Sequence, residues 1–191
     1  MYTIKDNHNT PLDKEMMDNL FYELNKELRK KLKKMPRGYK AELYVVGGAC
    51  VVSTLGTRNS TVDVDAVWNI GSEMRDCINK VADNNNLSHS WCNCDFKKTK
   101  SYTNAIMVNS WVYKSFDRLD VRMVNIDLLL AMKLIAFREY KITDRYDCIN
   151  IINEMRNRGL NPDTEFVCNI VKKYFSLDLL SESAKKFIGL R

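Results

Sequence analysis

Histidine is scarce in this 191-residue sequence. The chain has only two, His8 and His89, and both stand in polar surroundings without partner residues. Cys92 and Cys94 form a Cys-x-Cys pair, but a tetrahedral zinc site needs four ligands and the histidines are poorly placed to complete it. The sequence therefore argues against a structural zinc site, and we assign neither histidine a role.

Long apolar runs are also missing. The longest spans only a few residues, and the first ten residues, MYTIKDNHNT, contain neither a basic start with an apolar block nor a small-residue cleavage site. We therefore expect a cytoplasmic protein with no membrane partner. Four further cysteines stand in apolar or helical contexts, where reduced thiols pack as small hydrophobic side chains. They are Cys50, Cys77, Cys148 and Cys168.

The charge balance is only mildly basic. Lys and Arg number 30 and Asp and Glu 24, which gives a formal net charge of +6. This excess is compatible with a polyphosphate or nucleic-acid partner but does not require one. Positive charge gathers in RKKLKKMPRGYK at residues 29–40. A solvated helix end explains this run better than a nucleic-acid surface, unless the run lies near the functional site.

Apolar periodicity predicts a long helix that begins near Thr10 and ends near Leu32. Beyond it, strands occupy the middle of the chain and helices the end. The predicted strands are 43–46, 62–67, 106–113 and 119–124, the last two antiparallel neighbours, and the predicted helices are 49–55, 72 to about 84, 126–140, 143–158, 163–175 and 181–188. We therefore expect an α/β (α+β) fold: residues 1–125 form a short mixed sheet with the N-terminal helix, and residues 126–191 form a helical bundle packed on it.

Two carboxylates in a predicted strand are the strongest chemical feature. Asp63 and Asp65 lie in the alternating run Val-Asp-Val-Asp-Ala-Val at residues 62–67. Side chains two apart in a strand project from the same face, so the two acids point together and repel each other. A hard divalent cation such as Mg²⁺ relieves that repulsion. The alternative is a solvent-facing pair of acids at a sheet edge.

A Gly-Gly turn precedes these acids. Gly47 and Gly48 follow an apolar strand and precede a small apolar helix, so that backbone N–H groups are free to approach a phosphate at the helix N-terminus. A Gly-Gly pair alone is more often just a tight turn. Here it is followed in order by the short helix, Arg58, Ser60-Thr61 and the two acids, which puts a triphosphate cradle beside a metal-binding pair.

This order of motifs resembles the nucleotidyltransferase superfamily with the DNA polymerase β-type palm. Within it, the sequence is most similar to the small bacterial and phage proteins grouped with AbiEii-like and minimal nucleotidyltransferases of toxin–antitoxin and abortive-infection systems. The resemblance covers about residues 43–155. It includes Trp91-Cys92-Asn93 as a W-x-N segment, residues 129–134 as an LLAMKL helix, and Asp144 to Asp147 as a D-x-x-D segment.

The resemblance implies transfer of a nucleoside monophosphate from a nucleoside triphosphate to a hydroxyl, with two Mg²⁺ ions held by three carboxylates. It implies that Asp63 and Asp65 are the first two of these carboxylates and that Lys133 reaches the triphosphate. From the residues alone, Lys133 is either such a group or a lysine whose stem covers core surface. The expected nucleotide-binding residues are Gly47, Gly48, Arg58, Ser60, Thr61, Lys133, Asp144 and Asp147.

The third carboxylate is the open point. Asp120 stands between two apolar residues of a predicted strand and matches best, whereas Asp117 and Asp95 match less well. Because Arg118 and Arg122 flank Asp120, an ordinary cross-strand ion pair is the alternative. We expect Asp120 to complete the catalytic and metal-binding set.

Several functions remain compatible with the sequence. The acceptor hydroxyl could belong to the 3′ end of an RNA such as a tRNA, to a side chain of a partner protein, or to a small molecule such as an aminoglycoside. A basic groove leading to Asp63 would favour RNA, and a closed pocket would favour a small molecule. The alternative is an inactive member of the fold that only binds, such as an antitoxin or a phage regulator. The sequence leaves the oligomeric state open.

Overall fold

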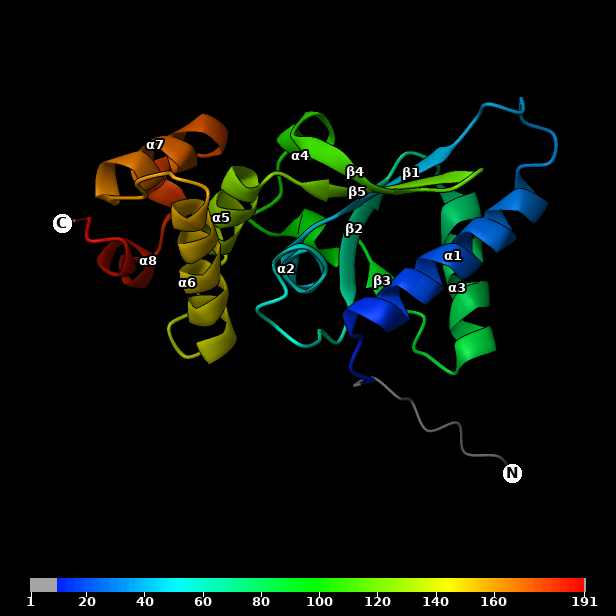
Figure 1. Cartoon of the computed structure of the whole chain (residues 1–191), viewed down its shortest axis with the longest axis horizontal. Helices are drawn as coiled ribbons and strands as arrows, with labels where there is room; N and C mark the ends of the chain where they lie inside the picture. Colours follow the sequence, from blue (N-terminus) through cyan, green and yellow to red (C-terminus); the bar gives the residue numbers. More distant parts are fainter. Residues whose placement is uncertain (1–9, 191) are drawn as a thin grey trace.

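The computed structural model describes residues 10–190. Residues 1–9, which include His8, and residue 191 lie outside the described residues. The chain forms a mixed sheet with helices at its start and end (Figure 1), so the expected α/β class is confirmed.

The sheet has five strands in the order β3-β2-β1-β5-β4. β1 pairs antiparallel with β2 and parallel with β5, β2 pairs parallel with β3, and β4 pairs antiparallel with β5. The expected adjacency of the last two strands is thereby confirmed. The strands are β1 (Ala41–Val45), β2 (Val64–Trp68), β3 (Cys92–Asn93), β4 (Ser110–Ser115) and β5 (Leu119–Val124).

The helices follow the predicted order with shifted ends. They are α1 (Lys14–Lys31), α2 (Gly47–Leu55), α3 (Ser72–Asn85), α4 (Ala105–Val108), α5 (Ile126–Ile135), α6 (Ile142–Asn157), α7 (Thr164–Tyr174) and α8 (Glu182–Phe187), with short 3₁₀ turns η1 (Asp95–Lys98) and η2 (Leu177–Leu179). The N-cap of α1 is Asp13, which accepts a hydrogen bond from the backbone N–H of Met16. The prediction that the helix begins at Thr10 was therefore wrong by about one turn.

The predicted strand at residues 106–113 was wrong in its first half. The structure has the short helix α4 there, and the strand starts only at Ser110. Local bonds explain the difference, because Thr103 Oγ1 accepts the N–H of Ala105 and both the backbone N–H and the side-chain amide of Asn109 donate to the carbonyl of Ala105. Such side-chain bonds close a helical turn in a segment whose apolar content predicts a strand.

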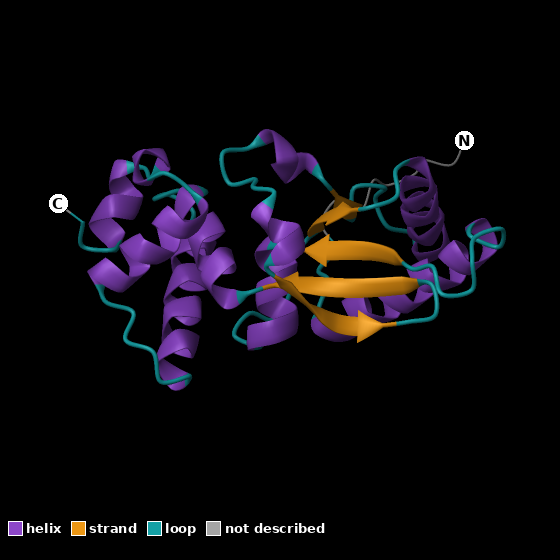
Figure 2. Ribbon diagram, turned by 90° about the horizontal axis from the view of Figure 1, so that it is seen from above, coloured by secondary structure: helices purple, strands orange, loops and turns teal. Residues whose placement is uncertain are grey.

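The sheet has one apolar face and one polar face. Alternate residues of β1 and β5, among them Leu43 and Val121, are fully buried and form the core with α1. The opposite face carries Glu42, paired across the strands with Asp120. Figure 2 shows β1, β5 and β4 with no helix of the described residues in front of them. Charged and polar side chains can therefore lie on this face of the sheet without being buried in the core.

The C-terminal helices gather at one end of the sheet (Figures 1 and 2). α5 packs on α6 and α7, and α2 contacts both α5 and α6. The helix predicted to reach Tyr140 ends at Ile135, and a turn in which the N–H of Lys141 bonds to the carbonyl of Arg138 leads into α6. Within residues 10–190, no helix is both long and apolar enough to cross a membrane.

Candidate functional site

The sharp change of direction from β1 into α2 requires Gly47 and Gly48, the first two residues of α2, which are called the Gly-Gly turn below. Gly47 has a φ of 63°, in the left-handed region, and a Cβ atom added there would lie 3.0 Å from Oδ2 of Asp65. A Cβ atom on Gly48 would lie 2.8 Å from Oγ1 of Thr61 and 3.0 Å from Nη1 of Arg58. The two glycines therefore let a carboxylate, a hydroxyl and a guanidinium close around the N-terminus of α2.

Asp63 and Asp65 lie at the start of β2, beside this turn. Burial first, and then the negative charge of Asp63, raise the pKa of Asp65 to about 6. The Asp65 carboxylate accepts no hydrogen bond from another described side chain, and Asp63 has only the amide of Asn93 at 3.5 Å. The pair is therefore poorly compensated and its oxygen atoms remain free for a ligand.

Two cations converge on one buried acid on the other side of the turn. Lys133 Nζ lies 2.6 Å and Arg58 Nη1 lies 3.2 Å from the same Oδ2 atom of Asp147. The Asp147 side chain is 3% exposed, against 14% for Lys133 and 27% for Arg58. A single carboxylate thus fixes two positive groups from different elements, and the cluster retains one net positive charge.

A second ion pair lies in the first turn of α6. The guanidinium of Arg138 grips Asp144 with two bonds, from Nε at 2.8 Å and from Nη2 at 3.2 Å. Such fork-to-fork pairs hold both planes in a fixed orientation. Asp144 and Asp147 both lie on the buried face of α6, as their spacing predicted. Each carboxylate is paired with one or two cations of the chain and is therefore not free to bind a ligand.

These groups surround one pocket of about 450 Å³. Its walls come from three distant parts of the chain: residues 46–65, residues 96–101, and the α5–α6 region at residues 129–144. Of the expected site residues, the pocket is lined by Gly47, Gly48, Arg58, Thr61, Asp63, Asp65, Lys133 and Asp144. Asp147 stands behind Lys133 and Arg58, and Ser60 contributes its backbone carbonyl, which accepts a bond from Nε of Arg58 at 2.8 Å.

Asp120 does not join this group, and its assignment as the third carboxylate was wrong. The strand register pairs Asp120 with Glu42, whereas Asp65 lies beyond Val45 at the other end of β1. Four residues along a strand and two strand spacings amount to about 16 Å. Asp120 instead accepts bonds from Lys40 at 2.9 Å and from Ser115 at 2.6 Å. Burial acts to raise the pKa of Asp120, but these two bonds together with the charges of Lys40 and Arg122 outweigh it and hold the pKa below its usual value.

The strand position level with Asp65 explains why β5 supplies no third acid. Val45 pairs with Met123, so the next residue, Val124, lies opposite the start of the turn. Val124 is apolar and buried. Asp95, in η1, also contributes to the raised pKa of Asp65. Among the described residues, no group of three or more Cys, His, Asp or Glu side chains is arranged to hold a metal ion.

The donor set fits one Mg²⁺ ion that is shared with a substrate. Mg²⁺ is usually held by one or two carboxylates and completes its octahedron with substrate phosphates and water. Asp63 and Asp65 supply such a pair, and the poor compensation of Asp65 is the observation that supports the fit. Both of the expected Mg²⁺ ions stay predictions.

Three cations that the sequence did not predict also line the pocket: Lys100, Arg138 and Lys141. The positive charge of Lys141 lowers the pKa of Asp65 and so opposes part of the rise caused by burial. The positions of Arg138 and Lys141 at the pocket were not predicted, because the helix was expected to continue through residue 140. A shorter helix would have placed both in a turn beside the D-x-x-D segment.

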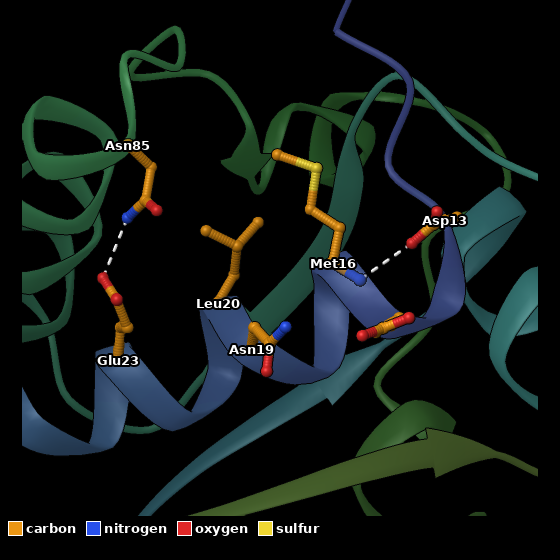
Figure 3. Close-up of a pocket in the computed structure, with 7 residues that line it drawn as sticks. Asp13, Met16, Asn19, Leu20, Glu23 and Asn85 are labelled. Atoms are coloured by element: carbon orange, nitrogen blue, oxygen red, sulfur yellow. Dashed lines mark hydrogen bonds between the residues drawn. The ribbon is translucent and has the colours of Figure 1, made fainter.

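Two other charged regions lie apart from this pocket. A hollow of about 290 Å³ between α1 and α3 carries acidic residues (Figure 3), but Asp13 caps α1 there and Glu23 accepts the amide of Asn85 at 2.8 Å. The basic run at the end of α1, including Lys30 and Lys33, precedes the start of β1, while the Gly-Gly turn follows the end of β1. The run therefore does not lead into the pocket.

Comparison of the chain with known protein families, with curated proteins and with solved structures finds no match.

Proposed function

We propose that the chain is a metal-dependent nucleotidyltransferase that moves a nucleoside monophosphate from a nucleoside triphosphate to a hydroxyl acceptor. The observation that carries the proposal is the convergence of three parts in one pocket. These parts are the Gly47-Gly48 turn, the acids Asp63 and Asp65, and the cations held by Asp147.

Each part matches one need of a bound triphosphate. The N–H groups in the first turn of α2 and the side chains of Arg58 and Lys133 attract phosphate oxygens. Their positive charge is only partly offset by Asp147, because two cations share one carboxylate. Phosphates bound there lie beside Asp63 and Asp65. A divalent cation is needed between them, because the phosphates and the two carboxylates would otherwise repel each other.

The proposed reaction makes use of that placement. The acceptor oxygen forms a bond to the α-phosphorus, the bond from that phosphorus to the bridging oxygen breaks, pyrophosphate leaves with the electron pair, and the hydroxyl proton passes to solvent. Mg²⁺ bound by Asp63 and Asp65 supplies charge neutralisation of the reacting phosphate. The chain itself supplies orientation through Arg58 and Lys133.

The test is a transfer assay with matched variants. Wild type is incubated with Mg²⁺, each labelled nucleoside triphosphate, and a mixture of cellular RNA and protein. Asp63→Asn and Lys133→Gln should abolish label transfer, whereas Glu165→Gln and Lys33→Gln, which remove equivalent charges outside the pocket, should retain it. Transfer that persists in Asp63→Asn would remove this residue from the mechanism.

A second candidate is a binding module that holds a nucleotide without transferring it. The observation that favours it is the position of Asp120, because β5 presents Val124 instead of a third acid at the level of Asp65. Binding of Mg²⁺ with a triphosphate, measured by calorimetry, separates the two. The module predicts binding that depends on Asp63 and Lys133 and no label transfer to any acceptor.

A further inference from the structure

Unmatched positive charge flanks the pocket from two segments that are far apart in sequence. Residues 97–100 carry Lys97, Lys98 and Lys100, all exposed, and Lys100 lines the pocket. Across it, Lys141 lines the pocket and Arg145 lies one turn further along α6. Within residues 10–190, only Lys98 of these five has an ion-pair partner, Asp95 at 3.5 Å.

Exposed apolar side chains accompany these cations. Tyr140 is 87% exposed, Ile142 67% and Tyr146 58%, although side chains of this size are usually at least half buried. Ile142 and Tyr146 are four residues apart on α6 and so share one face, next to the face that carries Thr143 and lines the pocket. Tyr140 lies beside Arg138, whose pKa it helps to raise.

The acids of this region offset its cations only in part. Between residues 138 and 146 only Glu139 and Asp144 are acidic. Asp144 is buried and gripped by Arg138, and Glu139 accepts a bond from Ser183 of α8 at 2.8 Å. The surface formed by residues 95–100 and 138–146 therefore combines exposed aromatic rings with six cations against three acids.

We propose that this surface binds single-stranded nucleic acid, whose terminal hydroxyl is the acceptor; this inference rests on the proposed nucleotidyl transfer. Tyr140 and Tyr146 stack unpaired bases, while Lys100, Lys141 and Arg145 contact the phosphates that lead toward Asp63 and Asp65. Base stacking on aromatic rings inside a basic groove is the usual way to bind single strands without sequence preference. A protein partner would need only the apolar side chains and leaves the cations on both segments unexplained.

The direct test measures binding of a fluorescein-labelled 12-nucleotide single-stranded RNA of mixed sequence to the full chain by anisotropy. Tyr140→Ala and Tyr146→Ala should each weaken binding about tenfold, the size expected for loss of one base stack. Lys141→Gln and Arg145→Gln together should lower the slope of log affinity against log salt by roughly 1.4. Tyr22→Ala on α1 and Lys33→Gln just after it are matched controls and should leave binding unchanged.

Nucleotide binding is measured on the same variants to separate this inference from the proposed function. The tyrosine variants should bind Mg²⁺ with a triphosphate as wild type does and should lose transfer to the RNA. Equal RNA affinity in wild type and the tyrosine variants, equal affinity for a duplex of the same sequence, or label transfer to protein alone would each overturn the inference while nucleotidyl transfer stands. Absence of nucleotide binding in wild type would instead overturn the proposed function and, with it, the acceptor role.

Discussion

Lys133 on α5 and Asp147 on α6 form a nearly buried ion pair, with Nζ of the lysine 2.6 Å from Oδ2 of the aspartate. Arg58, from the segment between α2 and β2, reaches the same oxygen atom at 3.2 Å. The pair therefore ties the C-terminal helices to the segment that carries the Gly-Gly turn. It also keeps both cations at the edge of the pocket, the position from which the proposed function has them attract phosphate.

Replacing Asp147 should destabilise the whole chain. Asp147→Asn keeps the shape of the side chain but leaves two cations without their counter-charge in a nearly buried place, which costs about 3 kcal/mol of unfolding free energy. Urea denaturation measures this loss. Asp76→Asn is the matched control, because its pair with Lys31 is about half exposed and solvent screens it, so its loss should have little effect on stability. Similar losses in the two variants would contradict the tethering role of Asp147.

Gly48 is expected to tolerate no side chain. In Gly48→Ala the new methyl group would press on Thr61 and Arg58, at 2.8 Å and 3.0 Å, and push the guanidinium away from Asp147. Overpacking of this kind costs roughly 1–3 kcal/mol, and we expect weaker binding of the triphosphate as well. Gly38→Ala is the control, since a methyl group added at Gly38 would meet nothing within 4 Å. Thermal unfolding and nucleotide titration of both variants decide the matter.

The sequence was sufficient to predict those parts of the site that lie close together along the chain. Asp63 and Asp65 point to one side because strand side chains alternate, and the Gly-Gly turn follows from the strand that ends before it. Both features depend on short stretches of consecutive residues. The same holds for the placement of Asp144 and Asp147 on one face of a helix.

The sequence could not predict features that depend on strand register or on distant segments. Asp120 has the right neighbours for a third acid, but whether it meets Asp65 depends on how β5 slides along β1, and that offset is set by packing of the whole sheet. Lys100 and Lys141 line the same pocket although one lies just after η1 and the other just before α6. No pattern within a short stretch of sequence predicts that two such distant residues line the same pocket.

Asp120 should be dispensable for ligand binding. Asp120→Asn removes the partner of Lys40 on a partly exposed surface, so the loss of stability should remain below about 1 kcal/mol. Calorimetry should give the same affinity for Mg²⁺ with a triphosphate as in wild type, while Asp63→Asn lowers it at least tenfold. A comparable loss in Asp120→Asn would show that the acid at the far end of the sheet acts on the pocket after all.

Stability of the metal-free protein should fall as pH rises through the titration of Asp65. Its pKa is raised from 3.8 to about 6 in the folded chain, so the folded state holds a proton that the unfolded state has already released. At pH values below about 4 both states are protonated and Asp65 costs nothing. Between about pH 4 and pH 6 the penalty grows, and above about pH 6 it levels off at roughly 3 kcal/mol or less.

Asp65→Asn should therefore be more stable than wild type at about pH 8 and equal to it near pH 4. Urea denaturation in the presence of a chelator at these two pH values measures the difference, with Glu165→Gln, an exposed acid of α7, as the control that should show no such trend. Addition of Mg²⁺ should restore the stability of wild type at the higher pH but leave Asp65→Asn unchanged, because only the ionised carboxylate binds the ion. An Asp65→Asn variant that is no more stable than wild type at the higher pH would mean that the carboxylate is already compensated, and the case for a cation between Asp63 and Asp65 would lose its physical basis.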